Sequence, residues 1–320
     1  MAKLKERAQR GEDDTAKKAA PSGESGIGGM RMTPWRRRAP LMPALIWVII
    51  FTQIPMAMTL YYSVQRWNLM RPDQRGFAGF DNYAFILADP QFRNALLNTV
   101  VLTVAAVGFS LVIGLGFALL LNRPFRGRGF ARTLLITPFL IMPVAAALLW
   151  KYIMFDPVYG LLNVVLGPIF GQINWATSMP MTSIIIVVVW QWTPFFMLIQ
   201  LAGLQSQDIE QHEAMQTDGA GKLAIFRFLT LPSLRPYMEL SVLLGTVFIV
   251  QTFDAIFMIT QGGPGQSTTN VPFFVYLQAF RALDVGQAAA AAVIVVIATI
   301  IIAMIALRTM SRIFQVGEQL

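Results

Sequence analysis

The sequence predicts an all-α fold, a six-span transmembrane helical bundle. Of the 320 residues, 55% are hydrophobic and only 13% are charged, and the mean hydropathy is +0.56. So few polar side chains cannot cover the surface of a soluble globule of this length. The second observation is a series of uncharged stretches close to the roughly 20 residues that a helix needs to cross a bilayer. Most of the chain is therefore predicted to lie in a membrane.

Six such stretches follow one another along the chain. We expect the third to continue to residue 155, and an alternative count merges or loses it, because Lys151 lies near its end. The fifth contains a charged residue, Asp254. The stretches are residues 39–65, 94–122, 133–150, 180–207, 240–260 and 285–307.

Lysine and arginine in the short connecting segments predict the orientation, because such residues are in excess on the cytoplasmic side. Residues 123–132 carry four arginines, and residues 205–236 carry two arginines and a lysine. The segments after the third and fifth stretches carry one basic residue each, Lys151 and Arg281. The first connecting segment is an exception, although its arginines are accompanied by aspartates. We therefore predict that both termini are cytoplasmic.

Composition excludes several classes of chemistry. The chain has no cysteine and a single histidine, His212, so we predict no disulfide, no multi-histidine metal site and no histidine-based catalysis. The net charge of +8 is explained by basic membrane-flanking loops, and we predict no nucleic-acid partner. The phosphate-binding pattern GxxxxGK[ST] is absent. We therefore predict no cofactor in this chain and no ATP hydrolysis by it.

The two ends differ from the body of the chain. Residues 1–33 mix charge with Gly, Ser and Ala and have no apolar period, which predicts a disordered cytoplasmic tail. We assign residues 34–315 to the transmembrane domain and residues 316–320 to a short C-terminal tail.

The longest polar interruption in the second half is residues 208–236. Asp208 and Gln211 form a capping-box start, and Gly219 supplies the left-handed residue that ends a helix. A second short helix, residues 222–230, is expected to stop before a Leu-Pro pair, and Pro236 is expected to open the next span. Two such short helices cannot bury a core of their own. We therefore interpret them as a docking element for another protein; the alternative is an ordinary connector.

This segment resembles the "EAA" loop of the membrane permeases of binding-protein-dependent ABC transporters. The family pattern is Glu-Ala-Ala, then Gly, then a hydrophobic-Leu-Pro triplet, and methionine replaces the second alanine here. In that family the loop sits in a cleft of the cytoplasmic ATPase and transmits its closure to the membrane spans. The coupling residues that the resemblance implies are Glu213, Ala214, Met215, Asp218, Gly219, Leu231 and Pro232.

Further matches extend the resemblance over about residues 34–315. They are GFDNY, LLNTV, LQS and the T-x-GGP turn, and they are similar to the carbohydrate and polyol branch, which includes maltose, glycerol-phosphate and sorbitol/mannitol permeases. The resemblance implies a MetI-like fold in the bacterial inner membrane and transport of a sugar or sugar alcohol. It also implies partners: a second permease subunit, an ATPase dimer that holds ATP and Mg, and a periplasmic solute-binding protein.

Polar and aromatic residues inside the stretches are candidates for a solute pathway, because polar groups in a membrane are costly. In the fourth stretch, Trp190, Gln191 and Trp192 come shortly before a proline. This cluster suits a polyhydroxy solute, because indole rings stack on the C–H faces of sugars and amides bind their hydroxyls. In the fifth stretch, Gln251 and Asp254 are expected on one helical face with Val247 and Met258. The alternatives are that Asp254 pairs with Lys151 or Arg281 and that one tryptophan only anchors at the interface.

Two other classes of function compete with a permease subunit. The first is a stand-alone secondary transporter or channel for a small polar solute, which does not account for the docking segment. The second is a membrane-embedded enzyme, which should concentrate Asp, Glu or His at one membrane boundary. Here the acidic candidates are scattered, at Glu239 and Asp254.

Overall fold

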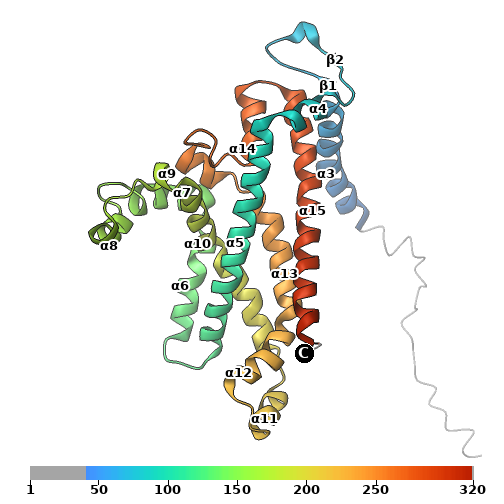
Figure 1. Cartoon of the computed structure of the whole chain (residues 1–320). Helices are drawn as coiled ribbons and strands as arrows, with labels where there is room; N and C mark the ends of the chain where they lie inside the picture. The colour runs from blue at the N-terminus through green and yellow to red at the C-terminus, as the bar shows by residue number, and fades with distance from the viewer. Residues whose placement is uncertain (1–40, 319–320) are drawn as a thin grey trace, which may run out of the picture. The chain divides into compact units, whose positions relative to one another are not determined.

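The structure is a computed structural model that describes residues 41–318 (Figure 1). The predicted N-terminal tail, residues 1–33, lies outside this range. The chain forms two compact units, Met1–Ile54 and Pro55–Leu320, and the division falls within helix α3 (Met42–Ser63). All packing described below belongs to the second unit.

The predicted all-α class is confirmed. Among the described residues the only strands are two-residue segments, β1 (Gln65–Arg66) and β2 (Gly76–Phe77), paired antiparallel. Four helices are long and apolar enough to cross a membrane, and a bent helix pair provides a fifth candidate. The four are α3, α5 (Pro90–Asn122), α10 (Pro180–Gln205) and residues Val285–Ile305 of α15 (Val285–Glu318). The six-span count and the cytoplasmic termini stay predictions.

The third predicted span is broken. It consists of α6 (Arg128–Leu140) and α7 (Pro143–Leu149), and α7 continues as the π-helical turn η3 (Trp150–Met154). The two parts are bent by 102°. Ile141 and Met142 are extended between them because a proline disfavours the helical conformation of the residue that precedes it. The prediction of one continuous helix was therefore wrong at Pro143.

The fifth predicted span, residues 240–260, is also not one helix. Helix α13 (Leu231–Ile249) begins earlier and ends inside the apolar stretch. The chain is helical again from Asp254 and passes into the π-helical turn η5 (Ile256–Thr260). In the gap, the side-chain amide of Asn270 donates to the carbonyl of Thr252 at 2.5 Å. This side-chain bond takes the place of a backbone hydrogen bond within a helix. The apolar composition of the stretch therefore could not show where the helix breaks.

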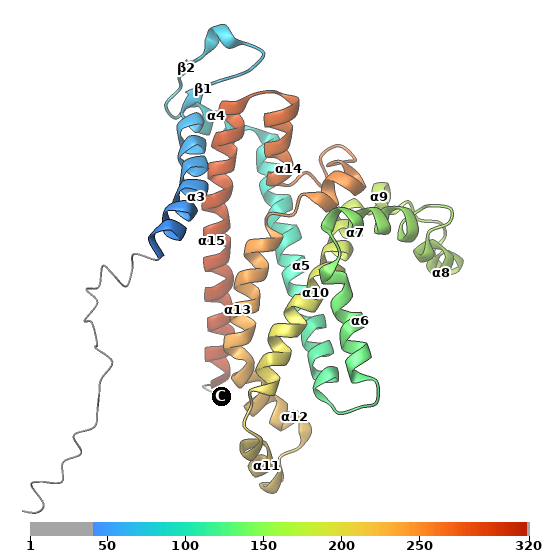
Figure 2. The same ribbon diagram turned by 180° about the vertical axis from the view of Figure 1, so that it is seen from behind.

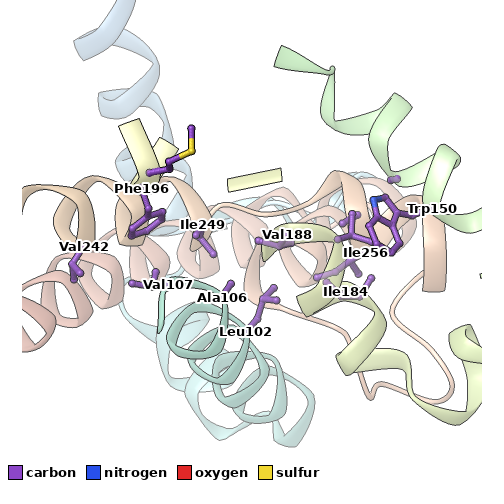
Figure 3. Close-up of a cluster of buried hydrophobic side chains, with 14 of the residues drawn as sticks. Leu102, Ala106, Val107, Trp150, Ile184, Val188, Phe196, Val242, Ile249 and Ile256 are labelled. Atoms are coloured by element: carbon purple, nitrogen blue, oxygen red, sulfur yellow. The ribbon is translucent and has the colours of Figure 1, made fainter. Parts of the chain in front are cut away.

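Helices α5, α10, α13 and α15 lie side by side and form the bundle, with α6 against α10 (Figures 1 and 2). The facing sides of α5, α10 and α13 form the main apolar core (Figure 3), whereas Ala291 of α15 belongs to a second, smaller cluster. Phe196 of α10 is fully buried at its centre, where Gly114 of α5 and Gly245 of α13 leave room for it. A Cβ atom on Gly114 would lie 2.9 Å from the backbone nitrogen of Met197. Glycine is therefore required for the close approach of α5 and α10.

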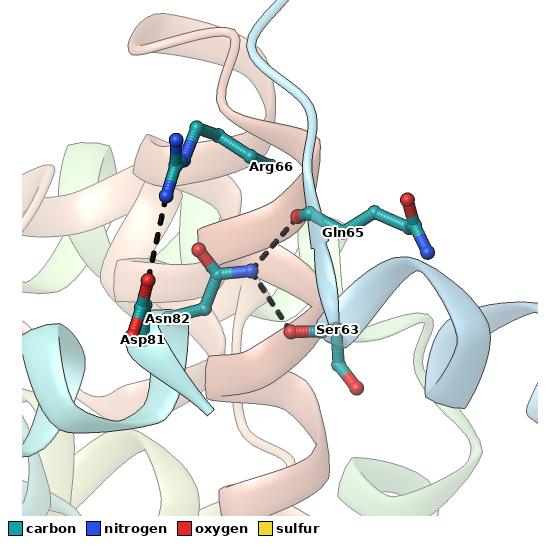
Figure 4. Close-up of polar contacts among 5 residues, drawn as sticks. All are labelled: Ser63, Gln65, Arg66, Asp81 and Asn82. Carbon is teal, nitrogen blue, oxygen red and sulfur yellow. Dashed lines mark hydrogen bonds and ion pairs between the residues drawn. The ribbon is translucent and has the colours of Figure 1, made fainter. Parts of the chain in front are cut away.

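One end of the bundle carries α4 (Asp81–Ala88), α14 (Val271–Tyr276) and the β1–β2 hairpin (Figure 1). Buried Asn82 donates two hydrogen bonds, to the carbonyls of Ser63 at 2.9 Å and Gln65 at 2.8 Å (Figure 4). An exposed ion pair joins Arg66 and Asp81 at 3.4 Å, and such pairs contribute little to stability. The Asn82 amide therefore holds the base of the hairpin.

Two short helices, α8 (Leu161–Phe170) and α9 (Trp175–Ser178), follow the bent pair. The ten residues of α8 are too few to cross a bilayer. Buried Asn163 orders this segment, since its Oδ1 accepts from the Trp175 indole at 3.2 Å and its Nδ2 donates to the Ile173 carbonyl at 2.9 Å. At the start of the segment, the backbone N–H groups of Tyr159 and Val158 lower the pKa of the Asp156 carboxyl.

Gly114→Val tests the close approach of α5 and α10. We expect it to lower the free energy of unfolding by about 2–3 kcal/mol, because the added atoms overpack the core. Thermal unfolding of the purified protein in detergent measures the effect. Gly116→Val is the matched control on the same helix, since nothing lies within 4 Å of a Cβ there. Equal stability of the two variants would contradict the packing described here.

Candidate coupling loop and solute-facing surface

The polar segment after α10 forms the two short helices that the sequence predicts. Helix α11 (Ile209–Thr217) is capped by Asp208, whose carboxylate accepts from the Glu210 N–H at 3.0 Å. Gly219 ends it in the left-handed conformation, with φ of +82°. The N–H of Ala220 then donates to the Met215 carbonyl at 2.9 Å. The predicted start and end of this helix are confirmed.

The second short helix departs from the prediction. Helix α12 (Lys222–Ile225) continues through the π-helical turn η4 (Phe226–Thr230) directly into α13. It does not stop before Leu231-Pro232, and Pro236 lies inside α13 rather than at its start. In the wide turn the Leu231 N–H donates to the carbonyl of Phe226, five residues back. This wider spacing accommodates a proline, which has no N–H to donate, without ending the helix.

We call residues 208–230 the coupling loop. It lies at the end of the bundle opposite the hairpin (Figure 1). No residue of α11 is buried, and Glu213, Ala214, Asp218 and Gly219 are exposed, whereas Met215 is half-buried. Three apolar side chains of the loop are exposed as well, Ile209 at 72%, Leu223 at 79% and Phe228 at 62%, whereas Ile225 is buried. Exposed apolar groups on so small an element favour a contact with another protein.

The base of the coupling loop is fastened to the bundle. The Gln207 side-chain amide donates to the Thr230 carbonyl at 3.3 Å, and the hydroxyls of Ser206 and Tyr237 are 2.9 Å apart. These bonds join the end of α10 to the start of α13. The coupling loop is therefore attached to two core helices.

The basic segments gather at the same end as the coupling loop. Residues 123–127 connect α5 to α6 there, and α15 also ends at this end of the bundle (Figures 1 and 2). This distribution agrees with the predicted orientation. That this end is cytoplasmic stays a prediction.

Trp190, Gln191 and Trp192 of α10 each contact a different part of the protein. The indole of Trp190 packs against Trp150 with ring centroids 5.6 Å apart. The Gln191 amide donates to the carbonyl of Ile141 at 3.1 Å, at the break between α6 and α7. Trp192 stacks on Phe248 of α13, with centroids 5.5 Å apart and an interplanar angle of 18°. Of the three, only Trp192 therefore faces the fifth predicted span.

Gln251 and Asp254 do not share a helical face with Val247 and Met258. The helix ends at Ile249, and Gln251 is exposed in the gap, where its amide donates to the Val247 carbonyl at 3.1 Å. The prediction assumed one continuous helix and was wrong for this reason. Phe248, which stacks on Trp192, follows Val247, whose carbonyl accepts from the Gln251 amide. We call Trp192, Phe248 and Gln251 the aromatic–amide surface.

Asp254 has no ion pair among residues 41–318. The alternative pairing with Lys151 is not formed, because the Lys151 ammonium donates to the Met258 carbonyl at 2.7 Å. Arg281 is exposed and does not meet Asp254 either. The carboxylate is half-buried beside the break in the fifth span.

Two residues of this region that the sequence analysis missed are Asn270, which holds the break in the fifth span, and Phe248, which stacks on Trp192. Asn270 is fully buried, and besides its bond to Thr252 its Oδ1 accepts from the Phe273 N–H at 3.0 Å. An asparagine just before a Val-Pro pair is a helix-capping signal that could have identified it. Phe248 has no such signal, because its role depends on the position of Trp192.

Two further polar residues, Gln200 and Glu239, bond within the protein. Gln200 is fully buried, and its amide bridges helices by donating to the Leu111 carbonyl of α5 at 3.2 Å. Glu239 accepts from Arg235 at 3.0 Å. Across residues 41–318, no group of three His, Cys, Asp or Glu side chains could hold a metal ion.

Comparison with known proteins identifies close relatives. A family model described as the binding-protein-dependent transport system inner membrane component matches residues 89–314. A probable ABC transporter permease protein of Sinorhizobium fredii is 38% identical over 78% of this chain and 81% of its own length. A sulfoquinovosyl glycerol transport system permease protein of Agrobacterium fabrum is 34% identical over 78% and 82%. The trehalose/maltose transport system permease protein of Thermococcus litoralis is 32% identical over 74% and 80%.

A solved structure shares the fold. It is the crystal structure of a bacterial ABC transporter involved in the import of the acidic polysaccharide alginate, with a TM-score of 0.73 and 23% identity. The match covers 87% of this chain and 96% of that chain. The same transporter in complex with an alginate pentasaccharide-bound periplasmic protein also has a TM-score of 0.73. At this identity the likeness is one of fold.

Asn270→Ala tests the role of this amide at the broken fifth span. We expect a loss of about 1–3 kcal/mol in the free energy of unfolding, because the Thr252 carbonyl is left without a partner in a buried site. Thermal unfolding in detergent measures it. Asn122→Ala, at the exposed end of α5, is the control and should leave the midpoint unchanged. An unchanged midpoint in Asn270→Ala would show that the bond does not hold the break.

Proposed function

Since the chain belongs to the family of binding-protein-dependent transport system inner membrane components, we propose that it is the permease subunit of an ATP-driven ABC importer that moves a sugar or sugar alcohol across the bacterial inner membrane. The observation that carries this proposal is the exposed, glycine-ended coupling loop, fastened to two core helices at one end of a multi-pass bundle. A transporter that works alone has no use for such an element.

Three features support a polyhydroxy solute without a phosphate group. Relatives are named for trehalose, maltose and sulfoquinovosyl glycerol transport. The aromatic–amide surface combines a stacked indole with an exposed amide, which suits the C–H faces and hydroxyls of a sugar. It carries no lysine or arginine, which a phosphorylated solute would favour. Trp190, Gln191 and Asp254 remain candidates for other parts of the pathway.

The proposed coupling follows from the fastening of the loop. A partner ATPase dimer, which would hold ATP and Mg, receives α11 in a cleft and moves it when the dimer closes. Because the loop is bonded to α10 and α13, this movement would shift both helices and change which side of the membrane the solute path opens to. This chain supplies no catalytic group of its own. A second permease subunit would complete the path, and a periplasmic solute-binding protein would deliver the solute.

Gly219→Pro should abolish coupling. Proline fixes φ near −65°, whereas Gly219 has φ of +82°, so α11 cannot end where it does. We expect stimulation of ATP hydrolysis by the solute-binding protein to be lost, with membrane insertion intact. ATPase assays on the reconstituted transporter measure this. Gly221→Ala is the matched control, because Gly221 has an ordinary φ of −71° and open space around it.

If the solute-binding protein stimulated ATP hydrolysis in Gly219→Pro as strongly as in the wild type, the coupling proposal would be wrong.

The orientation of the coupling loop in the membrane can be tested separately by cysteine labelling, because the chain contains no native cysteine. A cysteine introduced by Glu213→Cys should react with a membrane-impermeant maleimide only from the cytoplasmic side. Reaction from the periplasmic side would overturn the proposed function.

Trp192→Leu should weaken the apparent affinity of the transporter for the solute. Loss of the stacking indole is expected to raise the solute concentration for half-maximal uptake about fivefold to tenfold, with basal ATP hydrolysis unchanged. Uptake into proteoliposomes measures this. Trp192→Phe should retain most of the affinity, and Trp47→Leu on α3, where the indole is 64% exposed, should have no effect. An unchanged half-maximal concentration in Trp192→Leu would exclude this surface from the path.

A further inference from the structure

An apolar groove of about 810 Å³ lies between α5, α6 and α10. Its walls are aliphatic and aromatic side chains of all three helices, several of them exposed, such as Phe109 at 58% and Leu134 at 62%. The residues that line it most fully are Phe109, Ile113, Phe117, Leu134, Ile186 and Trp190.

Two of the three threonine hydroxyls in the groove, those of Thr137 and Thr193, are already bonded within their own helices, and the third belongs to Thr182. Thr137 Oγ1 donates to the Thr133 carbonyl at 2.9 Å, and Thr193 Oγ1 donates to the Val189 carbonyl at 2.6 Å. A sugar placed there would lose its hydrogen bonds with water and gain few in return. The groove is therefore suited to a hydrocarbon chain and not to the transported solute.

A cluster of arginines lies at one end of the groove. Arg123 and Arg126 belong to the α5–α6 connection, and Arg128 and Arg132 lie at the start of α6; we call these four residues the arginine turn. Leu134 follows Arg132 within one helical turn, and Phe117 precedes Arg123 by about 9 Å along α5. The groove thus opens close to the arginine turn.

The arginine turn has no negative charge of its own. Three of its arginines are exposed and Arg128 is half-buried, and none forms an ion pair within residues 41–318. No aspartate or glutamate occurs between residues 90 and 155. Two exposed aromatic rings, Phe125 at 47% and Phe130 at 76%, stand among the arginines. Arginines interleaved with exposed aromatic rings are typical of a membrane–water boundary.

We propose that the groove and the arginine turn together form a binding site for one anionic phospholipid. An acyl chain occupies the groove, and the phosphate of the head group binds the arginines. The two parts match the two parts of such a molecule in position as well as in chemistry. A helix of a second permease subunit would also cover the apolar walls, but it would leave four arginines without an anion.

The test measures lipid retention by native mass spectrometry. The full chain, with any subunits that co-purify, is exchanged into nanodiscs containing equal amounts of phosphatidylglycerol and phosphatidylcholine and then released. We expect phosphatidylglycerol to be retained selectively. Arg126→Gln with Arg128→Gln should reduce retention about 25-fold, or about fivefold for each arginine, while lysine at both positions should preserve it.

A second pair of variants tests the groove itself. Ile113→Trp fills it from α5 and should reduce retention about tenfold by displacing two or so methylenes of the acyl chain. Val112→Trp is the matched control, because Val112 is 70% exposed on the same helix but does not line the groove. Arg308→Gln, an exposed arginine on α15, controls for loss of charge.

Each remaining outcome contradicts the proposal. Equal retention of both lipids would remove the role of the arginine turn. Unchanged retention in Ile113→Trp would place the lipid elsewhere. Loss of a co-purifying second permease subunit in Ile113→Trp, with lipid retention unchanged, would identify the groove as a protein–protein interface instead.

Discussion

This structure depends on one constraint: every backbone polar group in a membrane needs a hydrogen-bond partner within the protein. In hydrocarbon an unpaired carbonyl costs several kcal/mol, so an interrupted helix survives only where another group replaces the lost bonds. Two predicted spans are interrupted here. Gln191 closes the break at Ile141, and Asn270 closes the break at Thr252.

The two broken spans also meet each other. The Lys151 ammonium, in the third, donates to the Met258 carbonyl in the fifth. A charged side chain thus donates a hydrogen bond to backbone that a π-helical turn has rearranged. Irregular backbone in membrane proteins is tolerated where it is buried in protein or lines a cavity. The position of Gln251 and Asp254 beside such a break explains why polar groups can occur in so apolar a stretch.

The end of the bundle that carries the coupling loop is stabilised in a different way. Helix α11 buries no residue, and its stability comes from a cap, a left-handed glycine and the bonds at its base. An element of this kind can move with a partner without disrupting a core. The long, closely packed contact of α5 with α10 provides the rigid body that such a movement would displace.

The sequence by itself determined the all-α class, most of the apolar stretches, the ends of α11 and the family. These depend on composition, on the spacing of glycine and on caps a few residues away, all of which act locally. Only the tertiary structure decided where the third and fifth spans break and the continuation of α12 into α13. The donor that closes the first break is 50 residues from its acceptor, and the lysine is 107 residues from its own. Partners so far apart in the chain are brought together by packing, which no local pattern encodes.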